Sequence, residues 1–288
     1  MRKTVSCTIV MFLAMNVASA AVIYATNGLA RPTSGPDDLI MFDSANPADY
    51  VTIGSMGVPD ISFGGMDFDR EGNLWAYASY RKSTGAIATG LYHVNTTTGE
   101  ATLQGGTASL LGIQDIAFNP VNNKMYGIYT RGTTARMYTI DLTTGEVRLR
   151  GTITGLPTEK MLMGFAIDSQ GNYYVHDITS DKIYKGAGLA MTELCTIPCD
   201  TDYSQGMTID WSRDDMGYHN AVGQAVSPHH FSQLGTFTTA GNYVLGPDFG
   251  PELPDELPPV ECGDLAIMPI PEPASFMLLA FAALLRRR

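Results

Sequence analysis

Asp or Asn recurs at one position of a repeating pattern, and the carboxylates among these side chains are candidates for chemistry. Each follows a short apolar segment and precedes turn residues: Asp69, Asn119, Asp168 and Asp210. A ring of such oxygens could hold a cation or a sugar. Asp and Asn also cap the backbone two residues further on, and this turn chemistry is the favoured interpretation. Asp69, Asp168 and Asp210 are therefore candidates for ligand binding, and capping of their own turns is the alternative role.

Asp67 stands apart from these turn residues. The equivalent position of the other repeats carries small residues, namely Ala117, Ala166, Thr208 and Ala266. A single acid among small residues is expected near the centre of a ring, which makes Asp67 a fourth ligand-binding candidate. The sequence has no Gly-x-Ser-x-Gly, phosphate loop or His-Glu-x-x-His motif, so no catalytic residue is assigned. No metal or other cofactor is expected; the acids are compatible with calcium, but nothing supports it.

A repeat of about fifty residues positions these acids. Its first full copy, residues 65–105, reads as four short strands separated by turns. Further copies begin at Asp115, Gly164 and Gly206. The copy that begins at Gly65 and the copy that begins at Asp115 share the turn Thr-Thr-Gly-Glu. A small sheet with two apolar faces must stack against copies of itself, so the period predicts a β-propeller.

The two ends of the repeat region complement each other. Residues 21–54 contain three strands and lack the first, whereas residues 264–267 have the pattern of a first strand and stand alone. Pairing of residues 264–267 with residues 22–25 would close the ring and remove an unpaired edge. The predicted fold is therefore all-β, a propeller of five four-stranded blades closed by its N- and C-terminal strands.

The third repeat resembles a known class of propeller. Its segment His176-Asp177, followed by Ser180-Asp181-Lys182-Ile183-Tyr184, is similar to the repeats of secreted NHL-type, lactonase-like and quinoprotein-like propellers. The resemblance implies a propeller fold. Such repeats occur in binding proteins and in enzymes alike, so the resemblance implies no single activity.

The N-terminal residues predict export. Arg2 and Lys3 precede a mostly apolar run, residues 9–17, and the small residues Ala18-Ser19-Ala20 follow. This three-part order is typical of a secretory signal peptide. We expect residues 1–20 to be removed by cleavage after Ala20.

A second three-part pattern lies near the other end of the sequence. Pro271, Glu272 and Pro273 precede an apolar run, and Arg286, Arg287 and Arg288 follow it. These residues resemble the PEP-CTERM sorting signal of exported bacterial proteins, which implies processing by an exosortase, a membrane cysteine protease. Residues 274–285 would span roughly 18 Å as a helix, against ~30 Å for a hydrocarbon core. We therefore expect transient membrane association, with the arginines on the cytoplasmic side.

The body between these two segments is acidic. The chain has 18 basic and 29 acidic residues and a formal charge of −11. The targeting segments hold five of the basic residues and one acidic residue, which leaves 13 basic and 28 acidic residues, or −15. Such a charge argues against nucleic acid and anionic lipid as partners of the body.

Export permits disulfides in the body. Cys195 and Cys199 are four residues apart, roughly 13 Å in an extended strand, and Pro198 favours a turn that would bring them together. A disulfide between Cys195 and Cys199 is the pairing that this spacing allows, whereas Cys262 lies beside the closing strand. A metal site is disfavoured because no second Cys or His pair with suitable spacing lies near.

Two functions are compatible with these features. The first is an exported propeller of the cell envelope, cell surface or extracellular matrix that binds a ligand or a matrix component, such as a surface polysaccharide, without catalysis. The second is a secreted hydrolase, lactonase-like or glycosidase-like, with acids at the mouth of the propeller channel. The expected domains are a signal peptide (residues 1–20), the propeller (residues 21–268) and a sorting and transient membrane segment (residues 269–288).

Overall fold

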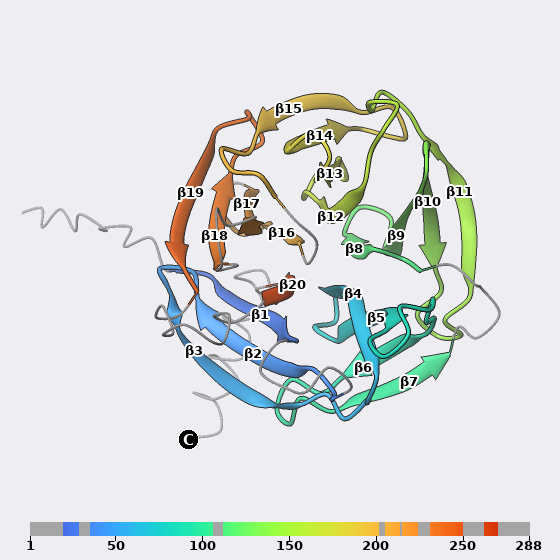
Figure 1. Ribbon diagram of the computed structural model, residues 1–288, viewed down its shortest axis with the longest axis vertical. Coiled ribbons are helices and arrows are strands. Elements are labelled where there is room, and N and C mark those ends of the chain that lie inside the picture. The colour runs from blue at the N-terminus through green and yellow to red at the C-terminus, as the bar shows by residue number, and fades with distance from the viewer. Residues whose placement is uncertain are drawn as a thin grey trace, which may run out of the picture.

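Five four-stranded antiparallel sheets surround a central axis in the computed structural model of the protein (Figure 1). The structure describes residues 20–28, 35–105, 112–201, 205–213, 215–223, 231–249 and 262–269. None of these residues is helical, so none lies in a helix long and apolar enough to cross a membrane. The prediction of a five-bladed, all-β propeller is confirmed. The predicted sorting signal and residues 1–19 of the predicted signal peptide lie outside the described residues.

Four of the blades follow the order of the chain, each with its first strand at the axis and its last strand at the rim (Figure 1). Their strands are β4 (Ile61–Phe68), β5 (Leu74–Arg81), β6 (Leu91–Val94) and β7 (Ala101–Gly105); β8 (Asp115–Asn119), β9 (Lys124–Arg131), β10 (Thr134–Ile140) and β11 (Val147–Ile153); β12 (Leu162–Ile167), β13 (Tyr173–Asp177), β14 (Lys182–Gly186) and β15 (Thr192–Thr196); and β16 (Gly206–Asp210), β17 (Met216–Gly223), β18 (Phe231–Phe237) and β19 (Tyr243–Asp248).

The fifth blade is assembled from both ends of the propeller. Its order is β20-β1-β2-β3, with β20 (Cys262–Ile267) at the axis and β1 (Val22–Asn27), β2 (Asp38–Asp43) and β3 (Asn46–Ser55) outside it. Ile23 pairs with Ile267 and Ala25 with Leu265. The inner strands contact one another in the order β4, β8, β12, β16, β20 and back to β4, so the ring is closed as predicted.

Each Thr-Thr-Gly-Glu turn connects the third and fourth strands of its own blade and contacts the rim strand of the preceding blade. In each turn the φ angle of the glycine is positive, +83° at Gly99 and +69° at Gly145, a conformation that glycine adopts without strain. A glycine at or next to the end of the preceding rim strand lies against the turn. A Cβ added to Gly105 would lie 2.1 Å from the carbonyl oxygen of Thr144, and one added to Gly54 would lie 2.2 Å from that of Thr98. Glycine is therefore needed where a rim strand meets the next blade.

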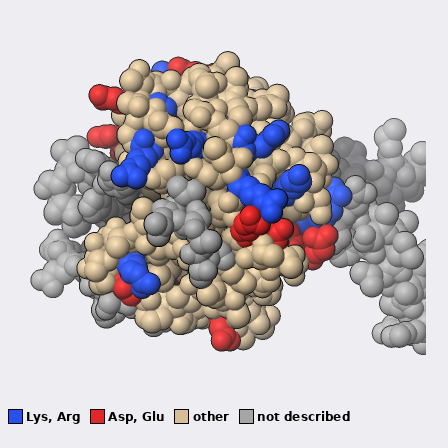
Figure 2. Space-filling model, turned by 90° about the vertical axis from the view of Figure 1, so that its right-hand side faces the viewer, with Lys and Arg blue, Asp and Glu red and all other residues tan. Residues whose placement is uncertain are grey.

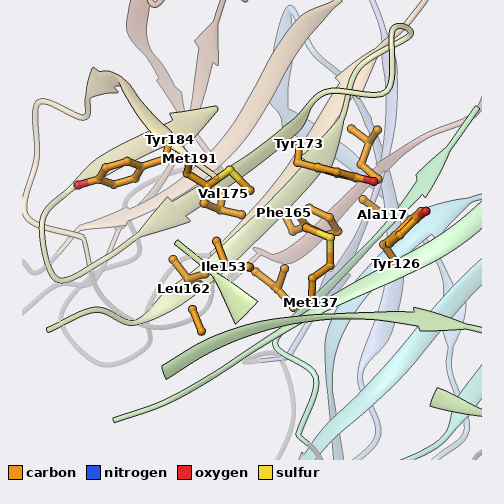
Figure 3. Close-up of a cluster of buried hydrophobic side chains, with 13 residues drawn as sticks. Ala117, Tyr126, Met137, Ile153, Leu162, Phe165, Tyr173, Val175, Tyr184 and Met191 are labelled. Atoms are coloured by element: carbon orange, nitrogen blue, oxygen red, sulfur yellow. The ribbon is translucent and has the colours of Figure 1, made fainter. Parts of the chain in front are cut away.

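Apolar side chains fill the space between blades. In one such cluster, Tyr126 and Met137 of the β8–β11 blade pack against Phe165, Tyr173 and Val175 of the β12–β15 blade (Figure 3). Both faces of a blade are thus buried, which explains why every residue of β8 and of β13 is buried rather than every second one.

Candidate functional site

Equivalent positions of neighbouring inner strands lie side by side around the axis. A Cβ added to Gly65 would lie 2.6 Å from the Cα atom of Asp115, and one added to Gly206 would lie 2.6 Å from the Cα atom of Asp264. Each glycine therefore leaves room for an aspartate of the next inner strand. The first position of the repeat carries Gly in three inner strands and Asp in β8 and β20.

Three inner-strand carboxylates occupy adjacent strands, and we call them the axial acids: Asp67 of β4, Asp115 of β8 and Asp264 of β20. Asp67 Oδ1 accepts a hydrogen bond from its neighbour Phe68 N–H (2.8 Å), and its Oδ2 accepts one from Phe118 N–H of the next blade (2.7 Å). Asp115 repeats this arrangement. Its Oδ1 accepts from Ile116 N–H (2.7 Å) and its Oδ2 from Phe165 N–H of the next blade (2.5 Å).

These hydrogen bonds have a structural cause. An inner strand is the edge of its sheet, so the backbone N–H groups that face the axis have no strand partner. A carboxylate that accepts one N–H from its own strand and one from the next satisfies both donors and ties two blades together. The axial acids Asp67 and Asp115 are therefore blade-to-blade connectors.

Asp264 has no such pair of donors. Its side chain is buried, and no described residue donates to its Oδ2 atom. Its own backbone N–H donates to Thr26 Oγ1 of β1 (3.2 Å). The axial acid of the closing strand thus carries an oxygen that is unpartnered within the described part of the chain.

Burial raises the pKa of all three axial acids. Loss of hydration raises the pKa of Asp67 to about 7. Loss of hydration, followed by the nearby charge of Asp264, raises the pKa of Asp115 well above its usual range. The pKa of Asp264 is raised by burial and then by the charge of Asp37, which itself pairs with Lys82. The charge of Asp67 also raises the pKa of Asp115, so both of the other axial acids act on Asp115.

Only Asp67 of this group is among the sequence-predicted site residues. The small residues at its equivalent positions do not line an open axis, since Ala117, Ala166 and Ala266 are buried between blades. Asp67 is partly exposed and lies across the gap between β4 and β8. The sequence did contain a signal for Asp115 and Asp264: both replace a glycine of the repeat.

The turn acids are held by their own turns. Asp69 accepts from the backbone and side chain of Asn73 and from Trp75 Nε1, each at 2.9 Å. Asp168 accepts in the same way from Asn172 N–H and Asn172 Nδ2, both at 2.8 Å, and from the Tyr174 hydroxyl at 2.9 Å. Asp210 accepts from Ser212 N–H and its hydroxyl. These contacts support turn chemistry, and ligand binding by Asp69, Asp168 and Asp210 stays a prediction.

A buried chain of hydrogen bonds joins the third and fourth blades. Thr201 donates its hydroxyl proton to Asp181 (2.6 Å), so it accepts from His176 Nε2 (3.3 Å). The Nδ1 atom of His176 then accepts from His219 Nε2 (3.0 Å), and His219 Nδ1 accepts from the Tyr243 hydroxyl (2.9 Å). Both imidazoles are neutral in this assignment. Burial, the main cause, lowers the pKa of His176 well below its usual value and that of His219 to about 3.

The cysteines and possible metal ligands form no further site. Cys195, Cys199 and Cys262 are free thiols in the structure, so the disulfide between Cys195 and Cys199 stays a prediction. Burial raises the pKa of the Cys195 thiol to about 11, which opposes thiolate chemistry there. Within the described ranges no three His, Cys, Asp or Glu residues are placed to hold a metal ion.

Comparison with solved structures shows the fold. A chain of a nidogen/laminin complex is 12% identical, with a TM-score of 0.51, over 86% of this chain and 98% of that chain. TolB from Acinetobacter baumannii is 12% identical (TM-score 0.46; 87% and 67% of the two chains), and virginiamycin B lyase from Staphylococcus aureus is 16% identical (TM-score 0.42; 81% and 75%). No curated protein matches the chain.

One protein family matches a long internal segment. The family is described as a repeat of unknown function (DUF6923), and the match covers residues 77–223. In the structure this segment runs from the second strand of the β4–β7 blade to the end of β17, and it includes two complete blades. The match covers half of the chain, so the protein belongs to the DUF6923 repeat family, here folded as a repeat-containing β-propeller.

Proposed function

We propose that the protein is an exported, non-catalytic binding module of the cell surface or extracellular matrix. Its signal peptide directs export, and the sorting signal around Pro271, Glu272 and Pro273 brings it transiently to the membrane for processing by an exosortase-type protease. The propeller body then presents a binding surface outside the cell. The supports for this route are the two three-part targeting patterns in the sequence.

One observation favours binding over catalysis. The carboxylates that the repeat offers for chemistry are engaged by the architecture itself: Asp67 and Asp115 by backbone N–H groups of two blades, Asp69 and Asp168 by their turns. A general acid or nucleophile needs an oxygen directed at a substrate. These four residues direct their oxygens at the protein.

The proposal is tested by locating the protein and by measuring binding. The full chain, expressed in a bacterium that has an exosortase, is followed by cell fractionation and by mass analysis of its ends. The purified protein is then applied to an array of surface polysaccharides and matrix proteins. We expect a processed protein at the cell surface that retains at least one matrix component. Full-length protein confined to the cytoplasm would refute export.

The sorting signal makes a separate prediction. Replacing Arg286, Arg287 and Arg288 by Asp should leave the thermal midpoint of the body unchanged but stop membrane retention and processing, because the orientation of a short apolar segment depends on flanking positive charge. Replacement of the same three residues by Lys keeps the charge and should be processed normally. Normal processing of the Asp variant would contradict the sorting-signal assignment.

The alternative, a secreted hydrolase of lactonase or glycosidase type, rests on the axial acids. A carboxyl group whose pKa is about 7, as in Asp67, can act as a general acid near neutral pH, and no described residue donates a hydrogen bond to Oδ2 of Asp264. Hydrolysis of a panel of lactones and aryl glycosides by the purified chain tests this function. Turnover that Asp67→Asn or Asp264→Asn abolishes would replace the binding proposal by catalysis.

A further inference from the structure

The cations of the propeller are unevenly distributed over its blades. Residues 115–153, which form the β8–β11 blade, contain five Lys and Arg residues and three Asp and Glu residues, an excess of two positive charges in a body of charge −15. We call the exposed side of this blade the basic wall. Its cations are Lys124, Arg131, Arg136, Arg148 and Arg150, and all five are exposed.

Four cations of the basic wall have no ion-pair or hydrogen-bond partner among the residues that the structure describes. The other described Lys and Arg side chains each make an ion pair or a hydrogen bond, for example Arg81 with Asp60, Lys182 with Glu193 and Arg213 with the Tyr218 hydroxyl. On the wall, Arg148 pairs with Glu146 at 2.8 Å. The described cations that form neither kind of contact with a described residue are Lys124, Arg131, Arg136 and Arg150.

The three acids of the blade leave these four cations unneutralised. Asp115 is buried at the axis, Asp141 accepts hydrogen bonds from the turn at Thr143 and Thr144, and Glu146 is taken by Arg148. Figure 2 looks at the side of the ring on which β10 and β11 lie, and it shows Lys and Arg side chains in a band across that side, with acidic side chains gathered below one end of the band.

The wall is extended rather than concave. Lys124 and Arg131 lie at the two ends of β9, seven residue steps apart, which is roughly 24 Å at ~3.4 Å per residue. Arg136 of β10 is paired with Tyr129 of β9, and Leu149, 60% exposed, lies between Arg148 and Arg150 on the rim strand β11. Successive side chains of a strand point to opposite sides, so Leu149 adds exposed apolar surface beside the cations. Separated cations of this kind suit a long ligand that carries regularly spaced acids on rings with apolar faces.

We propose that the basic wall binds an acidic polysaccharide through the carboxylates of its uronic acid residues. This inference rests on the proposed function and names the ligand class. Arginine matches a carboxylate with two parallel hydrogen bonds, and the apolar face of a pyranose ring covers Leu149. The acidic remainder of the body disfavours a nucleic acid or an anionic membrane, whose dense charge would also meet the neighbouring blades.

Polymer length is part of the recognition. An exposed Arg–carboxylate pair strengthens binding only a few-fold, and salt screens it. Several pairs on one chain act together, because the first contact raises the effective concentration of the next. We therefore expect measurable binding of polygalacturonate and no measurable binding of galacturonic acid monomer at the same uronate concentration.

The test uses the purified full chain and two forms of one polymer. Polygalacturonate is the probe, and its fully methyl-esterified form is the uncharged control. A wall variant removes four positive charges by Lys124→Gln, Arg131→Gln, Arg136→Gln and Arg150→Gln. A matched variant removes four from other blades by Arg81→Gln, Lys182→Gln, Lys185→Gln and Arg213→Gln. The four wall substitutions are at exposed positions, where a change rarely alters stability by more than about 0.5 kcal/mol each. Lys182, Lys185 and Arg213 of the matched variant are half-buried, so thermal midpoints of both variants are measured to verify that each is folded.

The expected results distinguish binding by the basic wall from a general effect of the protein's net charge. Affinity for polygalacturonate should fall at least tenfold in the wall variant, by less than threefold in the matched variant, and steeply for the wild type as salt rises from about 20 to about 500 mM. Equal losses in the two variants, equal binding of the esterified polymer, or tighter binding of DNA or anionic vesicles would each overturn the inference. A protein that reaches the surface and binds other matrix components, but not polygalacturonate, refutes this inference and leaves the proposed function intact.

Discussion

Single carboxylate side chains at the axis accept hydrogen bonds from backbone N–H groups of the inner strands. The innermost strand of a blade presents backbone N–H groups that no other strand covers, and here Asp67 and Asp115 accept them across the gap to the next blade. Asp115 is thereby buried and Asp67 is left only partly exposed, and loss of hydration raises the pKa of each. Asp264 is buried as well, and within the described part of the chain no hydrogen bond to its Oδ2 atom offsets the cost of that burial.

Replacing Asp264 by Asn should stabilise the protein in a pH-dependent manner. The pKa of Asp264 in the folded state lies above its unfolded value, so ionisation costs nothing below about pH 4 and costs progressively more as the pH rises toward the folded pKa. Thermal unfolding of Asp264→Asn and wild type should give similar midpoints at pH 4. At pH 8 the variant should melt several degrees higher, at about 2–4 °C per kcal/mol for a domain of this size. A lower midpoint of the variant at pH 8 would show that the carboxylate has a stabilising partner.

The histidine chain predicts the opposite dependence on pH. The pKa of His219 is depressed to about 3 in the folded state, whereas an unfolded histidine has a pKa of about 6.5, so its contribution to stability is present above pH 6.5 and is lost as the pH falls toward 3. His219→Gln should unfold more easily than wild type at pH 7, by about 1–3 kcal/mol, because it breaks two buried hydrogen bonds. The difference in free energy of unfolding between wild type and His219→Gln should be smaller at pH 4 than at pH 7.

A matched variant isolates the titration of His219 from the loss of its contacts. Tyr243→Phe removes the hydroxyl that donates to His219 Nδ1 but no group that titrates in acid. Its difference in thermal midpoint from wild type should therefore stay constant between pH 7 and pH 4. A constant difference for His219→Gln as well would mean that the buried imidazole does not titrate in this range.

Residue-level features were only partly predictable from the sequence. Turn capping by Asp69 and Asp168 could be recognised because the capping residue and its donors are neighbours in the chain. Asp115 and Asp264 were missed as a group because their proximity depends on two blades that are far apart in sequence. The contact between His176 and His219 was missed for the same reason, since 43 residues separate them.

At the scale of elements, the repeated Thr-Thr-Gly-Glu turn also forms a contact between its own blade and the rim strand of the preceding blade. Thr-Thr-Gly-Glu is a sequence signal for a turn, but its second role depends on the rim strand of the preceding blade. Gln104 beside Gly105 donates to the Thr143 carbonyl at 2.9 Å, and Gly105 lies directly against Thr144. The strand pattern therefore predicted four strands per blade, whereas the joints between blades could be identified only from the structure.

Gly105→Ala tests that joint. The added methyl group would lie 2.1 Å from a backbone oxygen, which cannot move without displacing the turn, so we expect a loss of about 1–3 kcal/mol in the free energy of unfolding. Gly188→Ala is the matched control, because nothing lies within 4 Å of its added Cβ. Urea unfolding of both variants measures the difference. Equal stability of the two would show that rim strand and turn are not in contact.

At the scale of the whole molecule, closure of the ring depends on β20, which comes late in the chain and completes the blade formed by the first three strands. The complementary halves of a blade were recognisable in the sequence because a first strand without followers and three strands without a first can complete one another. The structure buries Leu265 and Ile267 in one core cluster with residues of β1 and β2, and it buries Ala266 in a second cluster with residues of the β4–β7 blade. The five repeats were thus predictable from the period and the closure from the two incomplete ends, while the basic wall depends on which repeat carries the cations.

Removal of the closing strand should open the ring. A chain ending at Pro259 lacks β20 and leaves β1 with an unpaired edge, and burial of Leu265 and Ile267 is worth about 1.5–3 kcal/mol each. A chain ending at Pro273 keeps β20 and serves as the control. We expect the shorter chain to melt at least 10 °C lower or to aggregate, and the longer one to melt like the full chain. Equal midpoints in thermal unfolding would refute closure by β20.

The closing blade also determines how the ring responds to mechanical tension. The segment that follows β20 leaves it beside Ile267, at the rung where Ile267 pairs with Ile23. A pull on that segment loads one rung of the antiparallel ladder at a time and peels β20 from β1, as a zipper opens. A pull on the basic wall instead spreads over the three strands β9, β10 and β11, which are hydrogen-bonded side by side. A molecule held by its tail and by its wall would therefore give way at the closing blade first.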